Sequence, residues 1–433
     1  MWKIYFLIFL SPLPFASTPP FWRYFWVAYI GFFAALSVLQ SRRGVFSRIP
    51  KSFYFPLFGV VLVLLGGGLQ VFFALTVSES QTIMTSTLIL SHLLWFLLVL
   101  NAFEKPNKVL DFILVVALII TCYSVYGLIV FLSGDNSILW FEKWASIGAL
   151  TSTFVNRNSF AAFAGIGLQC IIAYSFWFMS KKLSRTDTGG HRFVTILATN
   201  YSRVTALMLS GIILLTALLL TGSRGGGSTT LLSCLAMVGG LVFLVRDKKA
   251  RRRKSFFVVS LFICIAATIS ISGDNFFKRI DSLDTGDMRF KIYKGSLEAI
   301  QDRPYLGFGL GTFADAFAQY RSPDVFPGPV PVSVLRAHSD VIELAVTAGV
   351  PIATIALIAY MYAIVYFFKS ALQGQRYSVF LLLIGALFLQ LGLHSIIDFP
   401  FQVPSVSYLF TGLLAAGVYL VHEQIDHSAN GGM

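Results

Sequence analysis

Apolar runs of about 20 residues recur along almost the whole of this chain, and they limit its possible folds more than any other feature. A helix of about 20 residues crosses the roughly 30 Å hydrocarbon core of a bilayer. Because lipid cannot hydrogen-bond to the backbone, each span must satisfy its own amide groups, as a helix does. Charged residues make up only 12% of the chain, about half of the roughly 25% usual in soluble proteins. The sequence therefore predicts an all-α integral membrane protein.

Twelve apolar runs are predicted to form transmembrane helices, at residues 4–17, 21–40, 53–77, 82–103, 109–132, 158–180, 204–222, 228–245, 255–272, 340–368, 377–397 and 402–421. The first run is interrupted by Pro12 and Pro14; it is short enough for the core of a signal peptide, and we interpret it as a short first helix. The predicted organisation is nine helices in residues 1–272, a loop with short amphipathic helices in 273–339, and three helices with a short tail in 340–433.

The distribution of basic residues predicts the side of the membrane on which each loop lies. The net charge of +13 is concentrated in short loops between apolar runs, where it directs topology, and this argues against nucleic-acid binding. Alternate loops are rich in Lys and Arg, whereas the intervening short loops hold only Arg23, Lys143, Arg157 and Arg224. Because basic loops stay in the cytoplasm, we predict cytoplasmic termini and an outer long loop. We predict that the protein lies in the inner membrane of a Gram-negative cell, where the long outer loop would be in the periplasm.

The long polar segment contains two recognisable patterns. Residues 287–302 are predicted to form a short amphipathic helix, with Met288, Ile292, Leu297 and Ile300 on one side. The glycine-rich GFGLGTF segment that follows has the spacing of a nucleotide-binding loop, but no strand precedes it and ATP is absent outside the membrane. We therefore interpret it as a tight loop that packs against the membrane face.

Several arginines are candidates for binding an anionic substrate. Arg224 lies in TGSRGGG at the outer end of a predicted helix, and Arg289 lies in the amphipathic segment. The planar guanidinium suits phosphate because it donates two parallel charge-assisted hydrogen bonds. An arginine at a helix end also snorkels to lipid headgroups, and that alternative stays open for Arg224. Supporting candidates are Arg157, beside a helix entrance, and Arg303 and Arg336 in the long loop.

Two histidines near the predicted outer surface are candidates for proton transfer. His338 lies in RAHSD at the start of a long predicted helix, where the helix dipole favours a neutral imidazole that can accept a proton from a hydroxyl. A structural role for His338 is the alternative, since Ser339 and Asp340 are good helix caps. His394 and Asp398 are four residues apart and are predicted to share a helix face, either as functional or as packing residues.

Four of these segments together resemble the O-antigen ligase and O-antigen polymerase superfamily. They are TGSRGG, DMRFKIYKGSLEAIQDRPYLGFGLGTF, AHSDVIELAVTAGVP and HSIIDFP, in this order, and the resemblance extends over residues 150–420. It implies a GT-C-like membrane glycosyltransferase that moves a glycan from undecaprenyl diphosphate to lipid A–core, as in lipopolysaccharide biosynthesis. Direct attack on the anomeric carbon of such a donor would invert its configuration. Because the donor carries its own leaving group and the sequence has no pattern of metal ligands, we predict no metal and no cofactor.

The resemblance also implies roles for individual residues. By position, Arg224 and Arg289 match the two arginines with which the ligases hold the carrier diphosphate, and His338 matches their catalytic histidine. The ligase histidine motif continues through Gly349, but its last position here is Ile352 instead of Gly, Thr or Tyr. This departure keeps open a polymerase of O-antigen or exopolysaccharide, which would use the same donor and a lipid-linked glycan acceptor.

Two other classes of protein fit a chain with many apolar spans. A polysaccharide transporter or flippase usually needs ionisable residues at mid-membrane for ion coupling, and His92 is the main candidate here. A scaffold or sensor has no need of arginines and a histidine gathered on one face. Glycan transfer by purified protein without an ion gradient distinguishes an enzyme from both.

Overall fold

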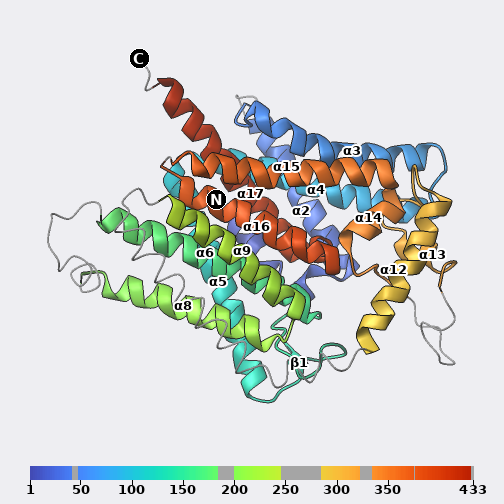
Figure 1. Ribbon diagram of the computed structural model, residues 1–433, viewed down its shortest axis with the longest axis horizontal. Coiled ribbons are helices and arrows are strands. Elements are labelled where there is room, and N and C mark those ends of the chain that lie inside the picture. The colour runs from blue at the N-terminus through green and yellow to red at the C-terminus, as the bar shows by residue number, and fades with distance from the viewer. Residues whose placement is uncertain (41–46, 184–198, 245–283, 322–333, 375, 431–433) are drawn as a thin grey trace.

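The computed structural model describes residues 1–40, 47–183, 199–244, 284–321, 334–374 and 376–430, and it is a bundle of long helices (Figure 1). The α-helices are α1 (Trp2–Leu10), α2 (Pro20–Gln40), α3 (Tyr54–Phe72), α4 (Glu79–Ala102), α5 (Pro106–Leu132), α6 (Arg157–Leu183), α8 (Tyr201–Leu220), α9 (Arg224–Phe243), α12 (Asp284–Asp302), α13 (Phe313–Phe317), α14 (Asp340–Ala348), α15 (Val350–Leu372), α16 (Ser378–Ile397) and α17 (Pro404–Asn430). Short 3-10 helices cover η1 (Phe15–Ser17), η2 (Lys51–Phe53) and η4 (Pro400–Gln402), and β1 (Ser137–Ile138) pairs with β2 (Phe141–Glu142) in an antiparallel hairpin.

The predicted fold class, an all-α integral membrane protein, is confirmed. Ten helices in the described ranges are long and apolar enough to cross a membrane: α2, α3, α4, α5, α6, α8, α9, α15, α16 and α17. The first predicted run forms α1, whose nine residues rise only about 14 Å and are too short to cross. The predicted run 255–272 and the prolines of 323–331 lie outside the described residues.

The prediction of one helix over residues 340–368 is wrong. The segment forms two helices, α14 and α15, which meet at Gly349. Gly349 has a positive φ of 85°, and a Cβ there would overlap the carbonyl of Tyr305. The chain therefore turns between α14 and α15 where a residue with a side chain would be strained and would clash.

Three helices form the centre of the bundle. The spans of α6, α16 and α17 are 83%, 72% and 89% buried, whereas no other described span exceeds 44%. Within this centre, Gln390 of α16 donates to the carbonyl oxygen of Ala162 and to Thr230 Oγ1, both at 3.1 Å, and accepts a hydrogen bond from Gln169. Hydrogen bonds between helices in lipid contribute about 0.6 to 2 kcal/mol each. This cluster links α6, α9 and α16 within the bundle.

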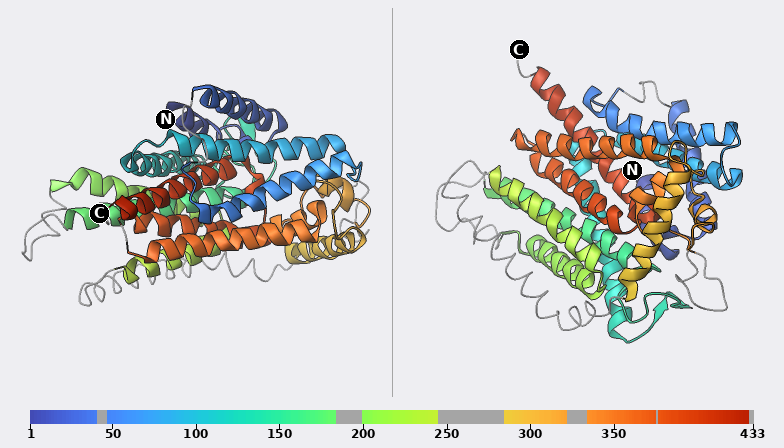
Figure 2. Two further views of the ribbon diagram at one scale, coloured as in Figure 1. Left: turned by 90° about the horizontal axis from the view of Figure 1, so that it is seen from above. Right: turned by 45° about the vertical axis from the view of Figure 1, so that its right-hand side comes forward.

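Helices α12, α13 and α14 form a layer across one end of the bundle (Figures 1 and 2). The predicted amphipathic helix is α12, and it begins at Asp284 rather than at residue 287. Its buried face includes Ile292, which is 2% exposed, but Leu297 is 55% exposed. The prediction for Leu297 is wrong because five residues correspond to about 140° around a helix, which turns Leu297 away from Ile292.

The GFGLGTF segment packs as a tight loop between this layer and the membrane helices, as predicted. The amides of Phe308 and Gly309 donate to the carbonyls of Val346 and Thr347 at 3.0 Å. The fully buried Gln70 of α3 supports the same loop: its Nε2 donates to the Thr347 carbonyl at 2.7 Å, and its Oε1 accepts from the Leu310 amide at 3.0 Å. The loop is therefore part of the scaffold that holds α14 on the bundle.

Candidate active site

Three of the predicted site residues, Arg289, His338 and His394, lie near the C-terminal end of α16, where Asp398 is the first residue after the helix. Asp398 is only 3% exposed. Its Oδ1 accepts from the Phe399 amide at 3.0 Å, its Oδ2 accepts from Nδ2 of Asn158, and its carbonyl oxygen accepts from the Asp340 amide at 3.1 Å. Asp398 thereby connects α6, α14 and α16. It lies beyond the helix, in extended backbone, so the prediction that His394 and Asp398 share a helix face is wrong.

Arg289 comes to this point from α12. Its Nη1 donates to the carbonyl oxygen of Ile397 at 3.0 Å, and its Nη2 lies 3.9 Å from Asp398 Oδ2. A cation is favourable there because the last carbonyls of a helix carry partial negative charge. The side chain of Arg289 remains 37% exposed. The guanidinium is thus held by the helix end while part of it stays accessible.

His338 approaches Asp398 from the segment before α14. Its Nδ1 lies 3.9 Å from Asp398 Oδ1 and is buried without a hydrogen-bond partner, while the side chain as a whole is 36% exposed. The residue has a positive φ of 53°, and Tyr293 donates a hydrogen bond to its carbonyl oxygen at 3.0 Å. Strained backbone of this kind persists only where its surroundings impose it. Of the two ring nitrogens, Nε2 is the one that can face a substrate.

A buried carboxylate that the sequence analysis missed shapes the segment around His338. Glu343 of α14 is 5% exposed, and it accepts hydrogen bonds from Arg336 Nη1 and from the Ala337 amide, both at 3.0 Å. Ser339 caps α14 by accepting from the Ile342 amide. Arg336 is therefore part of the support for His338. The sequence offered one sign of this pairing, because a glutamate inside an apolar run usually has a buried partner.

Arg224 is the first residue of α9, whose first turn packs against the end of α16. Ser223 caps α9 by accepting from the Gly226 amide, and Arg224 is exposed. A Cβ at Gly225 would lie 2.7 Å from Ile397 Cδ1, and one at Gly226 would overlap Ala161. These two glycines therefore allow α9 to pack closely on α16 and α6, where small residues favour helix contact.

The two remaining supporting arginines have different surroundings. Arg157 is the first residue of α6, and its amide donates to Ser146 Oγ at 3.3 Å. Arg303 donates to the carbonyl oxygen of Leu75 at 3.1 Å, and its guanidinium lies 4.7 Å from the centre of the Phe308 ring. Arg303 follows Arg289 by fourteen residues, which corresponds to about 21 Å along a helix. Arg303 therefore joins the outer layer to the α3–α4 turn, away from Asp398.

The electrostatic balance around Asp398 favours its charged form. Burial alone would raise the pKa of Asp398, but the electrostatic effects of the neighbouring His338, His394 and Arg289 side chains outweigh it and lower that pKa below its usual value. His394 of α16 is 1% exposed and precedes Asp398 by four residues. The site thus combines the buried carboxylate of Asp398 with a partly exposed imidazole and a partly exposed guanidinium.

Residues 209–357 match the model of a protein family described as O-antigen ligase. The resemblance to the O-antigen ligase and polymerase superfamily is confirmed. The matched residues include Arg224, Arg289 and His338, whereas Asp398 follows them in the chain. The family match and the ten apolar spans support a multi-pass membrane protein with a segment of the O-antigen ligase or polymerase type. A comparison with curated proteins found no match.

Proposed function

We propose that this protein transfers a glycan from an undecaprenyl diphosphate carrier to a hydroxyl of lipid A–core, at the periplasmic face of the inner membrane. The observation that supports this proposal is that the segments carrying Arg224, Arg289 and His338 all reach the same end of α16. The three residues come from separate elements, and Ile397 contacts both arginine-bearing helices through its side chain and its carbonyl oxygen. A phosphate-binding pair beside a proton acceptor is what transfer from a diphosphate donor requires.

In the proposed reaction, the acceptor oxygen attacks the anomeric carbon as the bond from that carbon to the carrier phosphate oxygen breaks. The electron pair of that bond leaves with the diphosphate, whose growing charge is stabilised by Arg224 and Arg289. His338 Nε2 takes the proton of the acceptor hydroxyl. Attack from the side opposite the leaving group inverts the configuration. The donor carries its own leaving group, so the proposal needs no nucleotide and no metal.

Asp398 supports this reaction as a positioning residue. A carboxylate beside Nδ1 favours the tautomer that carries its hydrogen there, which leaves the Nε2 lone pair free to accept a proton. The same charge stabilises the imidazolium that forms. The present separation of 3.9 Å is longer than a hydrogen bond, and such contacts commonly shorten when substrate binds.

A polymerase is the second candidate, and Ile352 at the last motif position favours it. Loss of each activity has a different effect on envelope polysaccharide. Deletion of a ligase is expected to leave bare core and carrier-linked polymer, whereas deletion of a polymerase leaves core with a single repeat. A polysaccharide gel of the deletion strain therefore decides between the two acceptors.

Transport is disfavoured by the surroundings of His92, the main ionisable candidate within the spans. Its Nδ1 lies 2.8 Å from the Leu88 carbonyl oxygen and its Nε2 lies 2.8 Å from Ser407 Oγ, while its ring stacks on Tyr408. Both ring nitrogens are satisfied in a neutral imidazole that joins α4 to α17. Purified protein in detergent, without an ion gradient, should transfer glycan from a lipid diphosphate donor; no transfer with a competent acceptor would refute the proposed function.

The proposed orientation makes a prediction for topology. Reporter fusions at Asp284 and Lys249 are expected to report opposite sides of the membrane, with Asp284 in the periplasm. The reason is that basic residues follow α9, whereas α12 lies at the end of the bundle where α9 begins. The measurement is the activity of two reporters fused at each position, one active only in the periplasm and one active only in the cytoplasm. The same side at both positions would contradict the orientation.

A further inference from the structure

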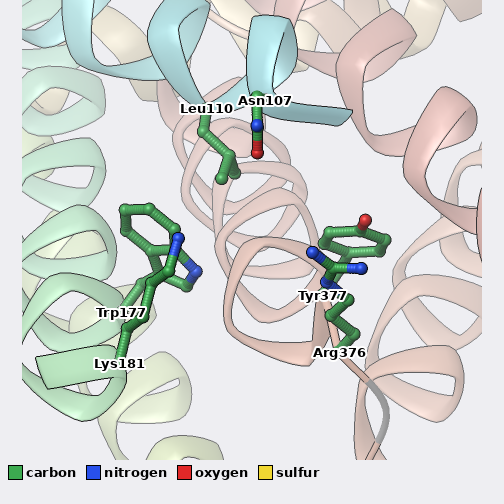
Figure 3. Close-up of a pocket in the computed structure, with 6 residues that line it drawn as sticks. All are labelled: Asn107, Leu110, Trp177, Lys181, Arg376 and Tyr377. Atoms are coloured by element: carbon green, nitrogen blue, oxygen red, sulfur yellow. The ribbon is translucent and has the colours of Figure 1, made fainter. Parts of the chain in front are cut away.

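A small cavity opens at the end of the bundle that lies away from His338 (Figure 3). It has a volume of about 160 Å³ and is lined by Asn107, Leu110, Trp177, Lys181, Arg376 and Tyr377. These residues come from the first turns of α5, the last turns of α6 and the two positions before α16. In Figure 3, Trp177 and Lys181 lie on one side of the cavity and Arg376 and Tyr377 on the other, with Asn107 and Leu110 above them.

The position of the cavity is that of the second membrane–water boundary. Arg157 and Lys181 are 24 residues apart on α6, which corresponds to about 36 Å of helical rise. Arg157 lies at the end of the bundle that carries Asp398. The cavity is therefore about one hydrocarbon thickness, roughly 30 Å, from the candidate active site. Trp and Tyr are enriched at this depth because their rings are apolar and their polar ends reach water.

The lining combines positive charge, a hydrogen-bonding amide and apolar side chains. Lys181 Nζ lies 4.9 Å from the centre of the Trp177 ring, and the guanidinium of Arg376 lies 5.5 Å from the centre of the Tyr377 ring. Each cation is thereby held against one wall of the cavity. Leu110 and Tyr377 are buried, while the side chains of Lys181 and Arg376 are exposed.

We propose that this cavity binds the phosphate of an anionic lipid headgroup from the leaflet opposite the active site. Arg376 and Lys181 neutralise the phosphate charge, and the Asn107 amide donates a further hydrogen bond. Leu110 and the Trp177 ring pack against the glycerol carbons. A volume of about 160 Å³ is below the roughly 300–1,000 Å³ of sites that enclose a whole drug-sized ligand, so the acyl chains stay in the bilayer.

Two cations from different segments, Lys181 near the end of α6 and Arg376 in the turn before α16, line one cavity that also contains an amide and two aromatic rings. A headgroup bound there bridges α5, α6 and the start of α16, and so it stabilises the folded bundle by linkage. Binding is therefore measurable as a rise in melting temperature, independently of any transfer activity.

The test compares full-length protein in uncharged detergent with added short-chain phosphatidylglycerol, phosphatidylcholine or inorganic phosphate. The pocket variant is Lys181→Gln with Arg376→Gln. The matched control is Lys108→Gln with Lys369→Gln, which removes the same charge from exposed positions outside the cavity. Phosphatidylglycerol is expected to raise the melting temperature of wild type and control, and the pocket variant should need at least about tenfold more lipid.

Three outcomes would overturn the proposal. They are an equal lipid requirement in the pocket and control variants, equal stabilisation by phosphatidylcholine, and full stabilisation by inorganic phosphate alone. If the pocket variant fails to fold, Asn107→Asp tests the same site while both cations remain. The new carboxylate should repel the headgroup and weaken the effect of phosphatidylglycerol, and an unchanged response would equally count against the site.

Discussion

Replacing His338 by alanine is expected to slow glycan transfer by roughly 10²–10⁴-fold, the usual loss when a general base is removed. Alanine, like histidine, has a Cβ, so the substitution leaves the backbone strain at the positive φ of 53° unchanged. The fold should therefore be preserved. Donor binding should also persist, because the arginines are untouched. Single-turnover transfer measured against pH, in wild type and His338→Ala, makes the test.

A histidine elsewhere provides the control for this variant. His422 lies near the far end of α17, 3.3 Å from Asp426, and His422→Ala should keep the wild-type rate. Asp398→Asn extends the test to the positioning residue: the acidic limb of the pH–rate profile should move to lower pH, because the nearby carboxylate no longer favours imidazolium. If His338→Ala retains the wild-type rate and pH profile, His338 is structural and another group is the base.

Replacing Arg224 or Arg289 by alanine is expected to cost about 3 kcal/mol of transition-state stabilisation, or roughly 100-fold in rate. Each arginine is proposed to donate a pair of charged hydrogen bonds to the leaving diphosphate. Lysine restores the charge but not the planar fork, so Arg224→Lys and Arg289→Lys should recover only part of the rate. Initial rates at saturating acceptor, over a range of donor concentrations, make the measurement.

The control for the arginines is Lys294→Ala, which removes one exposed basic side chain from the same helix as Arg289. It should leave the rate within about twofold, since exposed surface charges contribute little. Arg289 also donates to the Ile397 carbonyl, so its variants need a check of protein level and melting temperature. Full activity of both alanine variants at normal protein levels would remove the arginines from the diphosphate site.

The membrane helices were predictable because the length and apolar character of a span are properties of one continuous segment. The turn at Gly349 was not, because Gly349 and Pro351 interrupt a run that stays apolar on both sides. Proline is tolerated in the first turn of a helix, and Pro351 there starts α15. The prediction that Leu297 shares the face of Ile292 failed for a simpler reason, because a spacing of five residues does not match the helical period.

The sequence predicted those residues of the candidate site whose side-chain chemistry suggests a role, but not the contacts between them. Arg224, Arg289 and His338 stand out as side chains suited to phosphate and to proton transfer. The central position of Asp398 depends on contacts between distant segments, and its partner Asn158 is 240 residues away in the chain. No local pattern reports such a contact. The pairing of Arg336 with Glu343 and the binding of Arg303 to a carbonyl likewise required the folded arrangement.

The amide of Gln70 has a consequence for the order in which this protein assembles. It is part of an early membrane helix, yet its acceptor at Thr347 lies 277 residues later in the chain. At about 5–20 residues per second, synthesis of the intervening chain takes on the order of 15–55 s. During that time the amide must be satisfied by water or lipid headgroups near the membrane surface. The layer of α12, α13 and α14 can therefore close fully on α3 only after most of the chain has been made, and chains that stop before Leu306 lack all the partners that Gln70 has in the folded protein.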